Sequence, residues 1–240
     1  ISLYLNDESA DIQGTKLDYM STYSTLCADG NLEFGLRTEE GNTQNWLGLG
    51  DVHLYYYGIP DLFLDSRTYS PISHDTYAHV YLRNEFEAAH WNTLCLPFDV
   101  TAEDQAAYFA EVREITGMEL NGTTLRLTTA PATQMLAGKP YLVKTATEAE
   151  EMTFENMHVL AAAPQAVTFT EGDVTLTFRG QYNPTPLSAD MYACEEDYFV
   201  RPASTDGLSF RAYLTLEGGT TEYERILFDV GAEDEEQLPT

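Results

Sequence analysis

Positively charged residues are scarce in this 240-residue chain, which has 12 Lys and Arg against 39 Asp and Glu and a formal net charge of −27. Proteins that bind nucleic acid use clustered Lys and Arg to neutralise phosphates, so we expect no nucleic-acid partner. The acidity also disfavours attachment to anionic membrane surfaces. The acids serve solubility in the simplest interpretation, and binding of a hard cation such as calcium is the alternative.

Long apolar runs are absent. No segment approaches the roughly 20 apolar residues that cross a bilayer, so no membrane span is expected. The chain opens directly on the strand-like sequence ISLYLN. We therefore expect that an exported form has lost its signal peptide or carries it outside this sequence.

Cysteines are few and widely separated: Cys27, Cys95 and Cys194. Without a CxxC motif a structural zinc site is not expected, and an odd number of cysteines makes no complete disulfide framework. One disulfide bond is left open by the sequence. Cys95 lies in an apolar run, which indicates a small buried hydrophobic residue.

Catalytic motifs are missing as well. The histidines have no HExxH spacing and the serines no GxSxG context. His90 precedes Cys95 by five residues, but the apolar setting of Cys95 favours an inert thiol over a nucleophile. Glycoside cleavage needs two acids across a cleft, and no signature selects such a pair here. We expect a chain that is not an enzyme.

Aromatic and β-branched residues recur in short runs between turn residues, and the chain has 16 Tyr and 11 Phe. This pattern predicts an all-β fold, a jelly-roll-like β-sandwich with one short helix. The expected strands are Ser2–Leu5, Leu17–Leu26, Leu32–Arg37, Val52–Tyr57, 77–86, 91–98, 114–120, 123–129, 139–145, 166–170, 174–182, 197–202, 209–216 and 224–230.

Three local features can be placed from the sequence. Thr101 and Asp104 form a variant capping box in front of the helix-forming residues 102–112. Asn121-Gly122 predicts a tight hairpin turn. Trp91, Leu94, Leu96 and Phe98 predict a strand that is covered on both faces.

The chain divides into four regions in this interpretation. Residues 1–58 form a partial jelly-roll-like β region, too short for a typical sandwich of about 100 residues. A connector with Pro60 and Pro71 follows at residues 59–75. Residues 76–232 form a second β-sandwich domain, and residues 233–240 an acidic tail.

Several strings carry a resemblance. NWLGLGDVHLYYYG and DGNLEFGL resemble the closing strands of jelly-roll modules in surface proteins of Bacteroides and its relatives. WNTLCLPFDVT, AGKPYLVK and FRAYLTL resemble the β-rich unit that often follows such a module. The resemblance implies a Bacteroidetes cell-surface or secreted protein, located outside the cell, with a role in glycan binding or adhesion.

The candidate binding residues are aromatic. Tyr55 and Tyr57 share one face of a strand and Tyr56 lies on the other, while Trp46 precedes them. Exposed rings can stack on sugars, although packing in the core is the alternative for each. No cofactor is expected. Asp51 is the candidate calcium ligand, because related modules place one at that point.

We therefore predict a non-catalytic extracellular module that binds a glycan or another surface protein. Two alternatives are kept: a purely structural spacer of a larger surface protein, and an accessory fragment of a glycoside hydrolase. An exposed aromatic patch favours binding, whereas a fully polar surface favours the spacer.

Overall fold

The computed structural model describes residues 2–5, 8–11, 32–37, 41, 53, 58–219 and 223–229. The fold is all-β and sandwich-like with one helix among these residues, which confirms the predicted fold class. The chain divides into two compact units, Ile1–Gly58 and Ile59–Thr240.

The first unit contains a three-stranded antiparallel sheet in the order β2-β1-β3, formed by β1 (Ser2–Leu5), β2 (Glu8–Asp11) and β3 (Phe34–Arg37). Strand β1 has the predicted bounds, and β3 lies within the predicted range. The expected strand Leu17–Leu26 lies outside the described residues. The same is true of Val52–Tyr57, of which only His53 is described.

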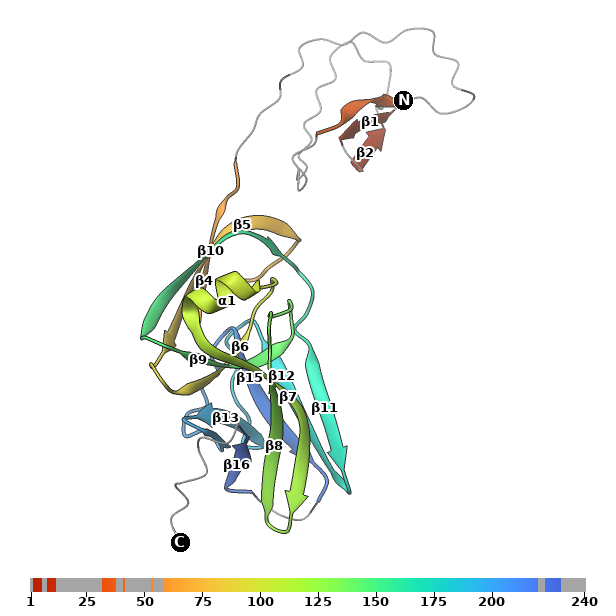
Figure 1. The fold of residues 1–240 in the computed structure, drawn as a ribbon. Helices are drawn as coiled ribbons and strands as arrows, with labels where there is room; N and C mark the ends of the chain where they lie inside the picture. Colours follow the sequence, from red (N-terminus) through yellow and green to blue (C-terminus); the bar gives the residue numbers. More distant parts are fainter. Residues whose placement is uncertain are drawn as a thin grey trace. The chain divides into compact units, whose positions relative to one another are not determined.

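The second unit contains a small sheet and a large one. The strands are β4 (Asp61–Asp65), β5 (Thr76–Phe86), β6 (Trp91–Cys95), β7 (Phe109–Asn121), β8 (Thr124–Pro131), β9 (Pro140–Thr145), β10 (Ala149–Val159), β11 (Ala166–Glu171), β12 (Val174–Gln181), β13 (Met191–Glu195), β14 (Tyr198–Val200), β15 (Arg211–Glu217) and β16 (Arg225–Phe228). The small sheet has the order β10-β5-β4 and the large one β11-β12-β15-β13-β14-β16-β8-β7-β9-β6. Figure 1 shows the small sheet near one end of this unit, with the hairpins β7–β8 and β11–β12 reaching toward the other.

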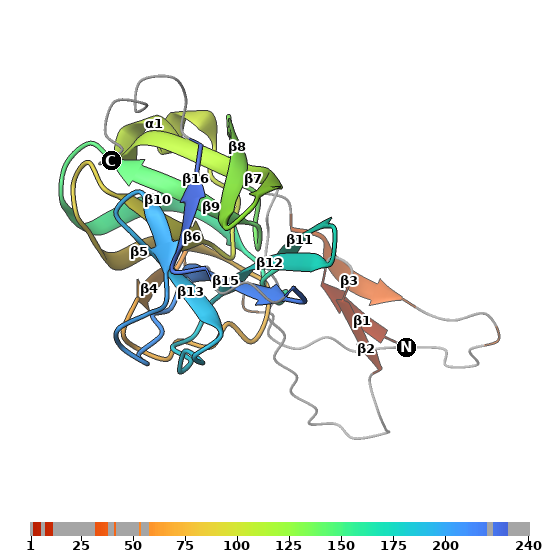
Figure 2. The same ribbon diagram turned by 90° about the horizontal axis from the view of Figure 1, so that it is seen from below.

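The second unit has two hydrophobic cores, and the large sheet curls around the one that we call the second core. Figure 2 looks at the unit from below and shows β12 and β15 on one side of the curve, with β7 and β9 on the other. The buried side chains between them form the second core: Trp91, Ile115, Met118, Leu125, Leu127, Leu142, Val174, Leu176, Phe178, Tyr192, Phe199, Ala212, Leu214, Tyr223, Ile226 and Phe228.

The small sheet packs against β6, β7 and β9 of the large sheet and encloses the first core. Its members are Leu64, Ala78, Val80, Leu82, Phe86, Leu94, Leu96, Phe98, Val100, Phe109, Val112, Met135, Tyr141, Val143, Met152, Phe154, Val159 and Phe210. Strands β6 and β9 thus lie between two cores. In β9, Leu142 enters the second core, while its neighbours Tyr141 and Val143 enter the first.

Trp91 faces the second core and Leu94 the first, so the predicted burial on both faces is confirmed, but β6 ends at Cys95 and the prediction of a strand as far as Phe98 is wrong. Trp91, Leu94, Leu96 and Phe98 are at most 2% exposed. Cys95 is buried, and both Cys95 and Cys194 are free thiols. Cys27 lies outside the described residues.

The last strand of the large sheet, β6, meets β15 through a side chain. The Thr93 hydroxyl donates to the Ala212 carbonyl at 2.8 Å and accepts from the Ala212 N–H at 3.0 Å. The Cys95 N–H donates to the Phe210 carbonyl at 3.0 Å. These bonds satisfy backbone groups that an open strand edge would leave unpaired.

The helix α1 (Ala102–Tyr108) begins as predicted and ends earlier. Thr101 is its N-cap and accepts from the Asp104 N–H at 3.2 Å. The expectation of helix through Val112 is wrong, because β7 starts at Phe109. Phe109 and Val112 face the first core, and pairing with β9 outweighs helix propensity there.

The hairpin at Asn121-Gly122 is present, with its turn one residue later. Asn121 pairs with Thr124, so Gly122 and Thr123 form the two-residue loop. Gly122 has a φ of 61°, a left-handed conformation that glycine adopts without steric cost.

The expectation of a connector at residues 59–75 is wrong for its first part. Residues 61–65 form β4, which pairs in parallel with β5. The buried Leu64 of this strand belongs to the first core, and packing there overrides the local Pro and turn residues. The acidic tail at 233–240 lies outside the described residues.

Candidate functional site

The aromatic and acidic residues singled out from the sequence lie outside the described residues. They are Trp46, Tyr55, Tyr56 and Tyr57 as ligand-binding residues and Asp51 as the calcium ligand. Binding at these positions stays a prediction.

A different aromatic surface lies on the small sheet, on the face turned away from the first core. We call it the outer face and define it by the outward side chains Asp61, Phe63, Asp65, Tyr77, His79, Tyr81, Arg83, Glu151, Thr153 and His158. Alternation along β5 produces it, because Ala78, Val80 and Leu82 are buried while the residues between them point outward.

A β-bulge in β10 keeps its alternation in step with β5. Phe154 pairs with Val80 and Met157 with Ala78, so β10 has one residue more than β5 over this stretch. Asn156 has a φ of 58° within the bulge. The extra residue brings His158 to the outer face, opposite Tyr77.

Two pairs of stacked rings lie on the outer face. Phe63 and Tyr81 have ring centroids 4.9 Å apart at 18°, and Tyr77 and His158 have centroids 4.6 Å apart at 10°. These separations match the spacing of neighbouring strands, about 4.8 Å. The paired rings therefore stand side by side across the strands, and they do not form one flat platform.

Phe63 is more exposed than Tyr81, the ring on which it stacks. It is 57% exposed, and it lies on β4, the last strand of the small sheet. Tyr81 covers one of its faces. The other face is open to a ligand approaching from the edge of the sheet.

Charges alternate in the row beside this aromatic row. Glu151 on β10, Arg83 on β5 and Asp65 on β4 are cross-strand neighbours. The Arg83 guanidinium donates to the Glu151 carboxylate at 2.8 Å. This bond, with the charge of Glu151, raises the pKa of Arg83. Acid, base and acid thus follow one another across the sheet.

The thiols of the second unit are unsuited to nucleophilic chemistry at neutral pH. Burial raises the pKa of Cys95 to about 12, and burial likewise raises that of Cys194 to about 12. The thiolate is the reactive form, and it is disfavoured at both positions. Among the residues that the structure describes, no three His, Cys, Asp or Glu side chains gather where they could hold a metal ion.

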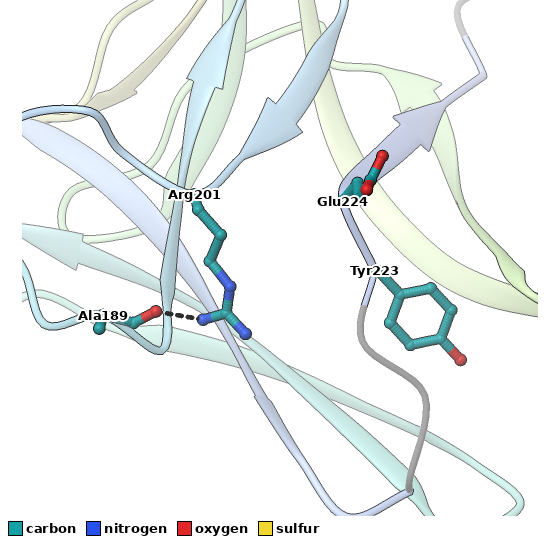
Figure 3. A pocket seen from close by; sticks show the side chains of 4 residues that line it. All are labelled: Ala189, Arg201, Tyr223 and Glu224. Carbon is teal, nitrogen blue, oxygen red and sulfur yellow. Dashed lines mark hydrogen bonds between the residues drawn. The ribbon is translucent and has the colours of Figure 1, made fainter.

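A shallow pocket of about 280 Å³ lies elsewhere, lined by Ala189, Arg201, Tyr223 and Glu224. Figure 3 shows Arg201 pointing toward Ala189, whereas the Tyr223 and Glu224 side chains point in other directions. The Arg201 guanidinium donates to the Ala189 carbonyl and lies 4.2 Å from the centre of the Tyr192 ring. The polar groups that line this pocket do not converge on one point, so the outer face is the better candidate site.

The sequence predictions do not include the outer face, although part of its alternating pattern is visible in the sequence. Tyr77, His79 and Tyr81 alternate within YAHVYLRNEF, and Asp61, Phe63 and Asp65 alternate within DLFLD. The first segment is correctly predicted as a strand, whereas the second falls within the predicted connector.

Comparison with known proteins finds no matching family model, no matching curated protein and no matching solved structure. The resemblance to Bacteroidetes surface proteins therefore stays a prediction. No helix in the described part of the chain is long and apolar enough to cross a membrane.

Proposed function

We propose that this chain is a non-catalytic adhesive module of an extracellular or cell-surface protein, and that it binds a partner protein through the outer face of β10-β5-β4. The observation that carries the proposal is Phe63, which is 57% exposed and stacked on Tyr81 at the open side of the sheet. Exposed aromatic side chains supply much of the binding energy at protein interfaces. The resemblance of the sequence to surface proteins supports the extracellular location.

The charge of the chain limits the partner. A net charge of −27 repels nucleic acid and other polyanions at long range. Asp61 and Asp65 lie two residues to either side of Phe63 on the same face, so the surroundings of the exposed ring are acidic. A partner with basic groups around an apolar centre matches this surface.

A neutral glycan is the second candidate ligand. The open face of Phe63 could stack on one sugar ring, and the carboxylates of Asp61 and Asp65 could accept hydrogen bonds from its hydroxyl groups. The rings of the outer face stand upright side by side, so they do not form the flat platform that favours stacking of sugar rings. A partner protein therefore matches this surface better than a glycan does.

The test is an array that carries neutral and charged glycans together with extended peptides of basic, acidic and neutral composition. The full chain is compared with Phe63→Ser, and with Leu136→Ser as a control that removes a 43% exposed apolar residue outside the outer face. We expect binding to peptides, reduced by Phe63→Ser and unchanged by Leu136→Ser. Glycan binding that depends on Phe63 would establish the second candidate instead.

Three other outcomes contradict the proposal. Binding that is equal in the two variants would place the site away from the outer face. Binding to nothing on the array would favour the structural spacer, and turnover of a glycan by the purified chain would overturn the non-catalytic assignment.

A further inference from the structure

The edge of the small sheet at β4 has backbone groups that face away from its partner strand. The His79 N–H donates to the Pro60 carbonyl at 2.9 Å, and the Ser66 N–H donates to the Arg83 carbonyl at 3.0 Å. In a parallel ladder every second residue faces the neighbour, so residues 60, 62, 64 and 66 face β5. The N–H and C=O groups of Asp61, Phe63 and Asp65 therefore point outward.

Most of these outward groups have no hydrogen-bond partner among the described residues. The exception is the Asp65 carbonyl, which accepts from the Thr68 N–H at 3.3 Å. Phe63 is central among the three, and its N–H and C=O are both available. A strand added at this edge would form its main hydrogen bonds with Phe63.

The opposite edge of the same sheet is occupied at Thr153 of β10. The Tyr108 hydroxyl of α1 donates to the Thr153 carbonyl at 2.7 Å and accepts from the Thr153 N–H at 3.0 Å. This contact occupies on β10 the kind of backbone groups that Phe63 leaves open on β4. The two edges of the sheet thus differ in their capacity to accept another strand.

The side-chain rows define what such a strand must carry. The row Glu151, Arg83, Asp65 alternates in charge, so a basic residue is favoured opposite Asp65 on the added strand. In the row of Tyr81 and Phe63, an aromatic residue is favoured opposite Phe63, where it would stack on the open face of that ring. Opposite Asp61 a basic residue is again favoured.

A second copy of β4 does not meet these requirements. An antiparallel pair centred on Phe63 would place Asp61 opposite Asp65, and a parallel pair in register would place each aspartate opposite itself. Like charges directly opposite each other destabilise a strand pair. The aspartates therefore protect this edge against self-association while leaving it open to a basic strand.

We infer that β4 accepts an extended segment of a partner protein in which two basic residues flank an aromatic residue at a spacing of two, with small or apolar residues between them. This inference rests on the proposed function and specifies its partner. The intervening residues would lie beside Leu62 and Leu64, which pack in the first core. Since the pattern reads the same in both directions, it fits parallel and antiparallel pairing alike.

The probe is a soluble labelled peptide with the central sequence Arg-Thr-Tyr-Thr-Arg. The control peptide carries Thr-Arg-Tyr-Arg-Thr, which has the same composition but turns both arginines to the core side of the sheet. Fluorescence anisotropy with the full chain should give binding of the first peptide that is about tenfold or more tighter than that of the control. Equal binding of the two peptides would mean attraction by net charge alone and would overturn strand addition.

A charge-reversed variant tests the pairing from the protein side. Asp61→Lys with Asp65→Asn is chosen because Asp65 also accepts from the Arg67 N–H at 2.8 Å, a bond that the asparagine oxygen retains. The variant should lose the preference for Arg-Thr-Tyr-Thr-Arg and gain affinity for Glu-Thr-Tyr-Thr-Glu, while its circular dichroism spectrum is unchanged. If ligands on the array bind through Phe63 but neither basic peptide binds, the proposed function stands and this inference fails.

Discussion

Replacing Thr93 by valine removes one hydroxyl group and tests how the curled sheet is joined at β6. Thr93 is 4% exposed, and its hydroxyl both donates to and accepts from the backbone of Ala212, which is fully buried. Valine keeps the β-branched shape of threonine. The substitution therefore changes hydrogen bonding at this point and leaves the strand propensity nearly the same.

The loss can be worked out from the two backbone groups. Each buried group left without a partner costs about 1–3 kcal/mol, so the Ala212 N–H and C=O together cost about 2–6 kcal/mol. The additional buried methyl group of valine returns about 1 kcal/mol. We expect the free energy of unfolding to fall by roughly 3 kcal/mol.

Urea denaturation followed by far-ultraviolet circular dichroism measures this change. The control is Thr177→Val, because Thr177 makes a 3.3 Å hydroxyl contact with Thr168 on an exposed part of the sheet. The control should stay within about 0.5 kcal/mol of the parent protein. A loss for Thr93→Val no larger than that of the control, with the same denaturant slope, would refute this account of the β6 edge.

Three further predictions concern the same unit. Thr101→Ala removes the acceptor for the Asp104 N–H and should lower the free energy of unfolding by about 1 kcal/mol, and an unchanged denaturation midpoint would contradict the capping role. Leu96→Ala should cost roughly 2–5 kcal/mol because the side chain is 1% exposed in the first core, whereas a loss below about 1 kcal/mol in urea would mean that its surroundings collapse onto the gap. The folded Cys95 thiol has a pKa of about 12 against 9.0 for an exposed thiol, so its stabilising effect is complete below pH 9 and declines as the pH rises toward 12. The decline should be about 1.4 kcal/mol per pH unit, and parallel stability curves for the parent and Cys95→Ser between pH 8 and pH 10.5 would exclude it.

Much of the second unit could be predicted because its central strands carry strong local signals. Trp91 and the apolar run from Leu94 to Phe98 reflect burial in the two cores, and their apolar character is visible in the sequence. The Thr101 cap is a local backbone contact, and it was placed correctly. The end of the helix was misplaced, because the pairing of Phe109 with Thr145 is a long-range contact that propensity does not contain.

The candidate site was harder to predict because two of its three strands have weak signals. β4 has only five residues between Pro60 and a turn, and two of its three outward residues are aspartates, which are rare in strands. β10 has Glu150 and Glu151 near its start, and its bulge at Asn156 breaks the period of two. The sequence pattern predicts neither strand, and without β4 and β10 it does not indicate the stacking of Phe63 on Tyr81 or of His158 on Tyr77.

The most direct test of the binding surface is hydrogen exchange at the Phe63 amide, measured by NMR on the isotope-labelled full chain with and without the peptide Arg-Thr-Tyr-Thr-Arg. Strand addition at β4 gives this outward N–H a hydrogen-bond acceptor, so its exchange should slow markedly in the complex. The N–H of Leu64 faces β5 in either state and serves as the internal reference. Saturating peptide that leaves exchange at Phe63 unchanged would contradict strand addition at the β4 edge.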